Sequence, residues 1–207
     1  MRMRAVNSVL ILALSIGTGV VALQAQGGGG GQQGGGGGAR GGAPAPPPMR
    51  MTTTSFEDGG ILPPKYVGAM GVSPALNWTN VPMGTQSFIL LLHDPDVAQQ
   101  RSTRDVTHWL VWNIPGTATG LPEGVPQGAE LPDGTRQVSL RANGYMGPAA
   151  PANAPYHHYT FELFALDAKI DVPASVPMDA VMTREAVMKA IDGHALGKAV
   201  LVGRFHQ

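Results

Sequence analysis

The chain has 207 residues, no cysteine, and 14 basic against 14 acidic residues, so its formal net charge at pH 7 is zero. The lack of cysteine excludes disulfide bonds, thiol catalysis and thiolate metal sites. The balanced charge offers no electrostatic basis for binding nucleic acid or anionic membrane surfaces.

The first 25 residues have the layout of a secretory signal peptide. Arg2 and Arg4 form a basic beginning, an apolar stretch follows from residue 6 to residue 23, and small residues surround Ala22 and Ala25. Cleavage after either alanine fits the pattern. A retained membrane anchor is the alternative, although the apolar stretch is short and contains glycines. The sequence therefore predicts a periplasmic or secreted protein whose only membrane contact is this segment.

A low-complexity segment follows the predicted signal peptide. Residues 26–50 contain two glycine runs and then an alanine- and proline-rich stretch. Glycine loses much backbone entropy on ordering and has no side chain to bury, so we expect a flexible linker that stiffens into polyproline II. Residues 51–207 remain, which is enough chain for one domain with its own apolar core.

Short apolar segments between proline and glycine turns favour a mainly β domain with minor α content. The proline- and glycine-rich residues 116–135 are expected in surface loops. An extended piece at 73–78 should bury Leu76 and Trp78. Strands are predicted at residues 52–56, 89–92 (an apolar run typical of burial on both faces), 106–114, 159–166 and 199–205.

One helix is expected near the C-terminus. Thr183 would cap its first turn, and Gly193 would close it. Its apolar face would consist of Ala186, Val187, Ala190 and Ile191.

Polar side chains collect at one end of the strands predicted at 89–92 and 106–114. The first ends in Asp94 and Asp96 around a proline, and His108 stands near the start of the second. If the two strands pair antiparallel, both carboxylates lie beside the imidazole at one rim of a sheet. We interpret this rim as a candidate site, although aspartates beside a proline also serve as ordinary turn residues.

A second polar group lies in residues 144–148 (Gly-Tyr-Met-Gly-Pro) and 156–159 (Tyr-His-His-Tyr). Because side chains alternate along a strand, His157 shares a face with Tyr159, and His158 points the other way. One of the two adjacent histidines is therefore predicted to face the site. His108 and His157 could instead be core histidines that hydrogen-bond backbone carbonyls.

The order of these motifs along the chain is distinctive. SPALNW, LLHDPD, THWLVWNIP, GYMGP, HHYTFELFALD and DGHALGKAVLVG follow one another in a way that resembles the phosphatidylethanolamine-binding protein (Raf kinase inhibitor-like) family, in its bacterial branch. The resemblance implies a large central antiparallel sheet, a smaller sheet and C-terminal helix. It also implies a pocket at one end of the sheet that accepts a small anion, such as the phosphate of a phospholipid head group.

The resemblance also assigns the ligand-binding positions residue by residue: Asp94, Asp96, His108, Gly147, Pro148, His157 and Tyr159. The family pattern Asp-Pro-Asp-Ala-Pro is not complete here, because Val97 and Ala98 stand in its last two places. The rim on that side is therefore expected to be looser or differently shaped.

A phosphate group needs hydrogen-bond donors, and the pocket motifs contain no arginine or lysine. The donors expected are imidazole N–H groups, backbone amides and the Tyr159 hydroxyl. Asp94 would orient a histidine and raise its pKa. Anion binding is then predicted to strengthen as the pH falls through the histidine titration near about 6.5.

Two other classes of function stay open. Members of this family include kinase and protease inhibitors, and an exported chain would meet an envelope protein such as a protease rather than a cytosolic kinase. A metal-dependent hydrolase could use two imidazoles and a carboxylate, but the chain has no HExxH motif, GxSxG elbow or glycine-rich phosphate loop. We therefore expect a binding protein, with a possible homodimeric state and no enzyme activity, cofactor or metal.

Overall fold

The computed structural model describes residues 46–207, so the predicted signal peptide and most of the predicted linker lie outside the described residues. Within residues 46–207, no helix has the length and apolar character needed to cross a membrane.

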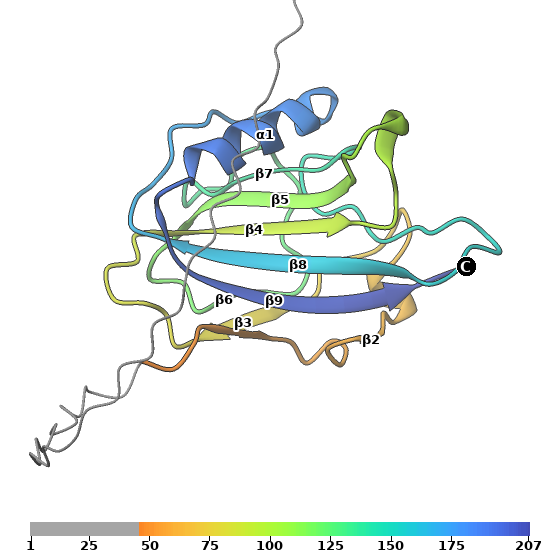
Figure 1. Ribbon diagram of the computed structural model, residues 1–207, viewed down its shortest axis with the longest axis horizontal. Coiled ribbons are helices and arrows are strands. Elements are labelled where there is room, and N and C mark those ends of the chain that lie inside the picture. The colour runs from red at the N-terminus through yellow and green to blue at the C-terminus, as the bar shows by residue number, and fades with distance from the viewer. Residues whose placement is uncertain (1–45) are drawn as a thin grey trace, which may run out of the picture. The chain divides into compact units, whose positions relative to one another are not determined.

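A six-stranded sheet forms the centre of the domain, in the order β2-β9-β8-β4-β5-β7 (Figure 1). The long inner strands pair antiparallel, whereas β2 runs parallel to β9. The strands are β2 (Gly60–Ile61), β4 (Ser87–Asp94), β5 (Val106–Pro115), β7 (Arg136–Val138), β8 (His157–Leu166) and β9 (Ala195–Phe205).

A smaller antiparallel sheet and a helix pack on opposite faces of the large sheet. The smaller sheet contains β1 (Arg50–Thr52), β3 (Leu76–Thr79) and β6 (Gly120–Leu121). The helix is α1 (Ala180–Ala190), and the single-turn 3-10 helices are η1 (Pro64–Tyr66), η2 (Gln99–Arg101) and η3 (Pro177–Asp179). The predicted mainly β fold with two sheets and a C-terminal helix is confirmed.

The core has two parts because β4 is buried on both faces, as predicted. Leu90 and Leu92 face the smaller sheet and pack with Trp78. Ile89 and Leu91 face the helix and pack with Val187. This alternation follows from the two-residue period of a strand. It also decides which of the polar residues at the end of β4 lie on the same face.

Several element boundaries differ from the predictions. β1 ends at Thr52, where the sequence predicted a strand to begin, and β8 and β9 begin two and four residues earlier than expected. Two residues of the expected loop region, Gly120–Leu121, pair with β3. The bounds of these strands are set by hydrogen bonding to neighbouring strands rather than by the β propensity of their own residues.

The prediction that Thr183 caps the helix is wrong. η3 begins at Pro177 and leads directly into α1, which therefore starts at Ala180. Thr183 is a buried residue inside the helix, and its hydroxyl lies 2.6 Å from the Ser175 hydroxyl. Of the predicted apolar face, Val187 and Ile191 are buried and Ala190 packs against them, whereas Ala186 is exposed. Ala180 and Thr183 complete the buried face.

Candidate functional site

The first pair of polar residues comes from neighbouring strands. Asp94 ends β4, His157 begins β8, and His157 Nδ1 lies 2.7 Å from Asp94 Oδ2. The other Asp94 oxygen accepts a hydrogen bond from the Asp96 backbone N–H at 3.0 Å. Asp94 is 3% exposed, so this carboxylate lies in a poorly solvated position with both oxygens occupied. An ionised carboxylate only accepts hydrogen bonds, and His157 therefore carries its N–H at Nδ1.

A β-bulge places His108 beside this pair. Leu92 pairs with Trp109 and His93 pairs with Thr107, so His108 is the extra residue of β5. An extra residue re-aims the side chains around it, and such bulges occur next to functional sites. Trp109 consequently packs in the core between the two sheets, while the adjacent His108 remains at the rim with Asp94 and His157.

His108 is anchored to the loop that follows β7. Its Nδ1 lies 3.0 Å from the Met146 carbonyl oxygen, and the Met146 backbone N–H donates to the His108 carbonyl at 2.9 Å. A carbonyl only accepts, so His108 also carries its N–H at Nδ1. Burial lowers the pKa of His108, and this effect exceeds the opposing influence of Met146 and Asp94. The ring is therefore held neutral at pH 7.

Tyr159 lies beneath both imidazoles. Its ring centroid is 5.1 Å from that of His108, edge to face, and 6.5 Å from that of His157. The side chain is fully buried, and its hydroxyl has no hydrogen-bond partner among the described residues. Burial, followed by the negative charge of Asp94, raises the pKa of Tyr159, so the hydroxyl stays protonated.

Residues 144–148 form one wall of the site. A side chain at Gly147 would collide with the backbone of Gly68, so only glycine permits these two loops to touch. The Pro148 carbonyl accepts a hydrogen bond from the Gly68 N–H at 2.7 Å. The Tyr145 hydroxyl donates to the Tyr66 carbonyl at 2.7 Å. These bonds fix the wall against the segment that follows η1.

A cavity of about 740 Å³ opens at this rim of the large sheet. Its polar lining comes from β4, β5, β8 and two loops, and consists of Asp94, His108, Gln127, Arg141, Tyr145 and His157. Arg141 is exposed at the cavity and makes no hydrogen bond or ion pair within residues 46–207. It is the one basic residue that lines this cavity.

The structure brings four of the seven predicted positions to the cavity surface: Asp94, His108, Gly147 and His157. Tyr159 and Pro148 lie behind the surface. Asp96 does not line the cavity, because its carboxylate turns outward and accepts hydrogen bonds from the His158 backbone N–H at 2.6 Å and from the His158 ring. His157 and His158 thus point to opposite sides, in keeping with strand alternation.

Sequence reasoning missed Arg141, which lines the cavity although the pocket motifs themselves contain no arginine or lysine. Arg141 belongs to an irregular segment just before the Gly-Tyr-Met-Gly-Pro motif, so no periodicity assigned it to a face. The only local signal was a basic residue close to a predicted pocket wall. Val97, which departs from the family pattern, also lines the cavity, and Ala98 directly precedes η2.

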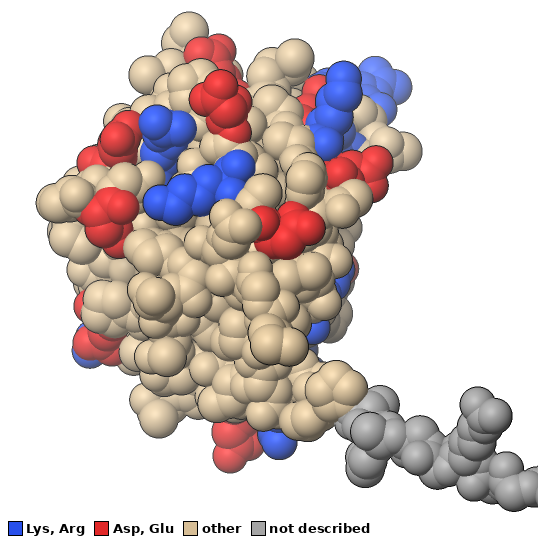
Figure 2. All heavy atoms as spheres, turned by 90° about the vertical axis from the view of Figure 1, so that its left-hand side faces the viewer, with Lys and Arg blue, Asp and Glu red and all other residues tan. Residues whose placement is uncertain are grey.

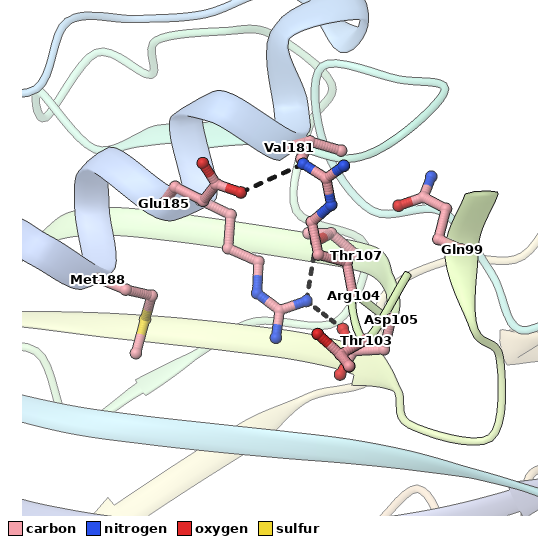
Figure 3. Close-up of a pocket in the computed structure, with 9 residues that line it drawn as sticks. Gln99, Thr103, Arg104, Asp105, Thr107, Val181, Glu185 and Met188 are labelled. Atoms are coloured by element: carbon pink, nitrogen blue, oxygen red, sulfur yellow. Dashed lines mark hydrogen bonds and ion pairs between the residues drawn. The ribbon is translucent and has the colours of Figure 1, made fainter. Parts of the chain in front are cut away.

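A second, smaller cavity of about 240 Å³ lies between η2, the start of β5 and α1 (Figure 3). Two arginines line it, and each already has an acidic partner. Arg104 lies 3.3 Å from Glu185, and Arg184 is paired with Asp105. Each guanidinium is already paired with a carboxylate. The smaller cavity therefore has less uncompensated positive charge for an anion than the rim cavity, which contains Arg141.

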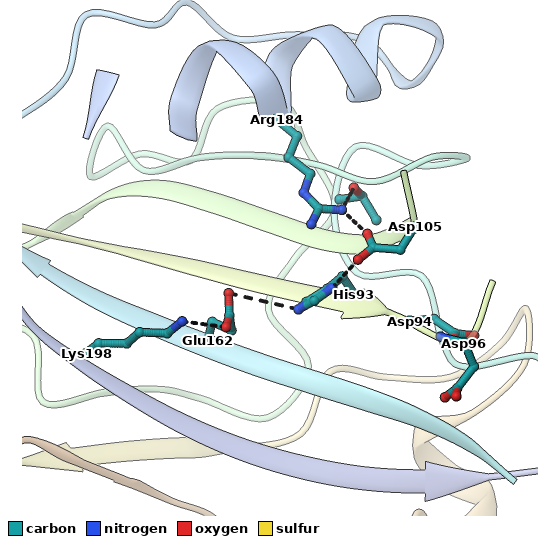
Figure 4. A network of polar contacts seen from close by, with 8 residues as sticks. His93, Asp94, Asp96, Asp105, Glu162, Arg184 and Lys198 are labelled. Carbon is teal, nitrogen blue, oxygen red and sulfur yellow. Dashed lines mark hydrogen bonds and ion pairs between the residues drawn. The ribbon is translucent and has the colours of Figure 1, made fainter. Parts of the chain in front are cut away.

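A chain of polar contacts crosses the helix-side face of the large sheet (Figure 4). Asp105 Oδ2 lies 2.6 Å from His93 Nδ1, and Lys198 lies 2.6 Å from Glu162, which approaches His93 Nε2 at 3.9 Å. His93 and Asp94 are adjacent on β4 and therefore lie on opposite faces of the sheet. This network links β4 to Arg184 of α1 and is separate from the rim cavity.

Charges of both signs alternate on the end of the domain away from the rim cavity. Figure 2 shows this end, with lysine, arginine, aspartate and glutamate intermixed and no broad area of one sign. Among residues 46–207, no three histidine, aspartate or glutamate side chains come together in an arrangement that could hold a metal ion.

The fold and the cavity define a class of β-sheet protein with a histidine- and aspartate-lined pocket at one rim of its central sheet. Residues 52–206 match the family described as phosphatidylethanolamine-binding protein. The chain belongs to this family, and the resemblance found in the sequence is confirmed.

Relatives and solved structures agree with this assignment. A UPF0098 protein of Methanothermobacter thermautotrophicus is 36% identical over 156 residues, which cover 74% of this chain and 95% of the relative. The solved structure of Escherichia coli YbcL, described as a member of the mammalian family, is 30% identical with a TM-score of 0.64 and covers 77% and 98% of the two chains. A family homologue from Chlamydia trachomatis is 28% identical, with a TM-score of 0.62 and the same coverage.

Proposed function

We propose that this protein is an exported binding protein whose rim cavity takes a small anionic group, such as the phosphate of a phospholipid head group. The observation that carries the proposal is the meeting of His108, His157 and Arg141 around one open cavity, although they are far apart in sequence. Family membership supports a binding role in general. The anionic ligand is inferred from the residues of this chain.

Arg141 supplies the positive charge that an anion requires. Its guanidinium is exposed at the cavity and is unpaired within the described residues, whereas the carboxylate of Asp94 is enclosed and hydrogen-bonded to His157. A free guanidinium can donate two parallel hydrogen bonds to a phosphate. The Asp94 carboxylate is therefore engaged by His157, and the Arg141 guanidinium is available to bind the ligand.

We propose binding rather than catalysis for this cavity. Nδ1 of each imidazole contacts an oxygen of the protein, namely the Met146 carbonyl for His108 and the Asp94 carboxylate for His157. No hydroxyl of residues 46–207 hydrogen-bonds either ring, so the nucleophile–base contact of a hydrolase is missing from the described part of the chain.

The experiment is calorimetric titration of the purified protein with phosphoethanolamine at pH 6. Arg141→Ala should weaken binding by about tenfold, because a charge-assisted hydrogen bond to the phosphate is lost. Arg101→Ala is the matched control, since Arg101 is exposed but does not line the cavity, and it should leave affinity unchanged. Absence of binding by the unaltered protein, or equal loss in both variants, would contradict the proposal.

A further inference from the structure

The rim cavity is larger than a small anion requires. Its volume is about 740 Å³, which lies within the range of about 300–1,000 Å³ found for pockets that enclose drug-sized ligands. Phosphoethanolamine is much smaller than such ligands, and its phosphate would occupy only the part of the cavity next to Arg141 and the two imidazoles. The remaining lining therefore indicates what else the ligand contains.

Three aliphatic side chains form one apolar wall of the cavity: Val97, Val106 and Leu140. Val106 is the partner of Asp94 in the pairing of β4 with β5, and the Val97 backbone nitrogen lies 3.5 Å from the Asp94 carbonyl oxygen. The Leu140 N–H donates to the Thr107 carbonyl at 3.1 Å. These backbone contacts hold the three residues next to one another, and each remains partly exposed in the cavity.

This apolar wall adjoins the residues proposed to hold the anion. Leu140 directly precedes Arg141, and Val106 lies two residues before His108 on β5. Val97 stands where the family pattern has alanine, so this chain carries a larger aliphatic side chain at the cavity. A single ligand can therefore contact the Arg141 guanidinium with one group and the apolar wall with the next.

The chemistry of the apolar wall decides which substituent on the phosphate it favours. Aliphatic side chains form no hydrogen bonds, so a polar substituent placed against them would lose its contacts with water without replacement. An apolar substituent gains affinity there, by about fourfold for each CH₂ group that it buries. Given the anion site proposed above, we propose that the ligand is a phosphoester with an apolar substituent, such as an alkyl chain, which covers Val97, Val106 and Leu140. The ethanolamine end of phosphoethanolamine stays in the open mouth of the cavity, so this probe reports on the anion site alone.

Propyl phosphate and glycerol 3-phosphate are a matched pair of ligands that tests the inference on the intact protein. Both have a phosphate on a chain of the same length, and they differ only in the hydroxyl groups of glycerol. At pH 7.5, above the second phosphate pKa of about 6, both carry the same charge. In calorimetric titrations we expect propyl phosphate to bind about tenfold more tightly than glycerol 3-phosphate, and hexyl phosphate to bind more tightly still. Equal affinity within the pair, or no gain from propyl to hexyl phosphate, would overturn the inference.

Substitutions in the apolar wall provide a second test. Val97→Thr keeps the shape of the side chain and replaces a methyl group by a hydroxyl, so it should weaken hexyl phosphate binding about threefold to tenfold more than it weakens phosphoethanolamine binding. Val176→Thr is the matched control, because Val176 is an exposed valine that does not line the cavity, and it should affect neither ligand. Equal losses for both ligands in Val97→Thr would contradict a role of the wall in holding an apolar substituent.

The outcomes separate the inference from the function it depends on. Binding of phosphoethanolamine without any gain along the alkyl series would overturn the inference and leave the anion site in place. Failure of every phosphate ester to bind would remove the anion site itself. Where the gain is observed, dihexanoylphosphatidylethanolamine identifies the source of the ligand. Tighter binding of this short-chain lipid than of hexyl phosphate indicates a phospholipid, and the reverse order indicates a single-chain ester; either order supports the inference.

Discussion

At the residue scale, hydrogen-bond partners distinguish His108 from four other histidines of the described residues. Nδ1 of His93, His157, His158 and His194 each contacts an aspartate, at 2.6 to 3.0 Å. His108 differs, because its Nδ1 contacts a backbone carbonyl and its ring sits in a β-bulge. Burial lowers the pKa of His108 and keeps its ring neutral, although the Met146 carbonyl and Asp94 act in the opposite direction.

Asp105 gives a stability prediction on the helix side of the sheet. Burial alone would raise the pKa of Asp105, but its hydrogen bonds with His93 and Arg184 outweigh burial and lower the pKa. Since the folded pKa lies below the unfolded value of about 3.9, the ionised carboxylate stabilises the fold above that pH. The contribution is lost as the pH falls through the folded pKa.

Urea unfolding of Asp105→Asn measures this contribution. At pH 7 and pH 5 we expect the free energy of unfolding to fall by about 1–3 kcal/mol, and the difference from the unaltered protein should shrink by pH 3. Asp171→Asn, at an exposed aspartate without a side-chain partner among the described residues, should change stability little at any pH. A difference that persists unchanged at pH 3 would show that packing, not charge, is responsible.

At the scale of elements, the pocket wall depends on a close approach of two loops. Gly147→Ala would push a methyl group into the Gly68 backbone, where no flexible side chain can move aside. The loops must then separate, which we expect to cost about 1–3 kcal/mol of stability and to weaken phosphoethanolamine binding. Thermal unfolding and calorimetry check both effects. Ala149→Ser, at an exposed position on the same wall, should leave both nearly unchanged.

The sequence predicted elements whose own residues carry the signal, and it failed where the signal comes from a neighbour. The apolar run of β4 predicted its burial, and alternation predicted that His157 and His158 diverge. The bulge at His108 left no trace in the sequence, because it arises from the register between β4 and β5. Thr183 resembled a helix cap, but η3 started the helix earlier. Arg141 lies in irregular backbone, where no period assigns a direction.

On the scale of the whole molecule, the ion-pair network and the rim cavity lie on different faces of the large sheet. The network from Lys198 to Arg184 lies on the helix side of the large sheet (Figure 4). The cavity is lined by Asp94 and His157 at the rim of the same sheet. β4 contributes to both through His93 and Asp94. Because side chains alternate between the two faces of a strand, His93 joins the polar network and the adjacent Asp94 lines the cavity. The two side chains do not touch.

The N-terminal segment, residues 1–25, leads to a prediction about export. Because the chain has no cysteine, its domain needs no oxidising compartment to fold, and folding alone cannot report where it resides. The position of the mature N-terminus, in contrast, reports whether the chain has been exported and cleaved. Expressed in a Gram-negative host, the full chain should appear in the periplasm beginning at Leu23 or Gln26, as read by mass spectrometry.

Replacing Arg2 and Arg4 by glutamate should reduce the exported fraction several-fold, since the basic residues orient the apolar stretch in the membrane. Arg40→Glu, which changes charge outside the signal peptide, is the matched control and should not affect export. A chain recovered from the membrane with residues 1–25 intact would identify the segment as an anchor. Recovery of the uncleaved chain from the cytoplasm would contradict the prediction of export.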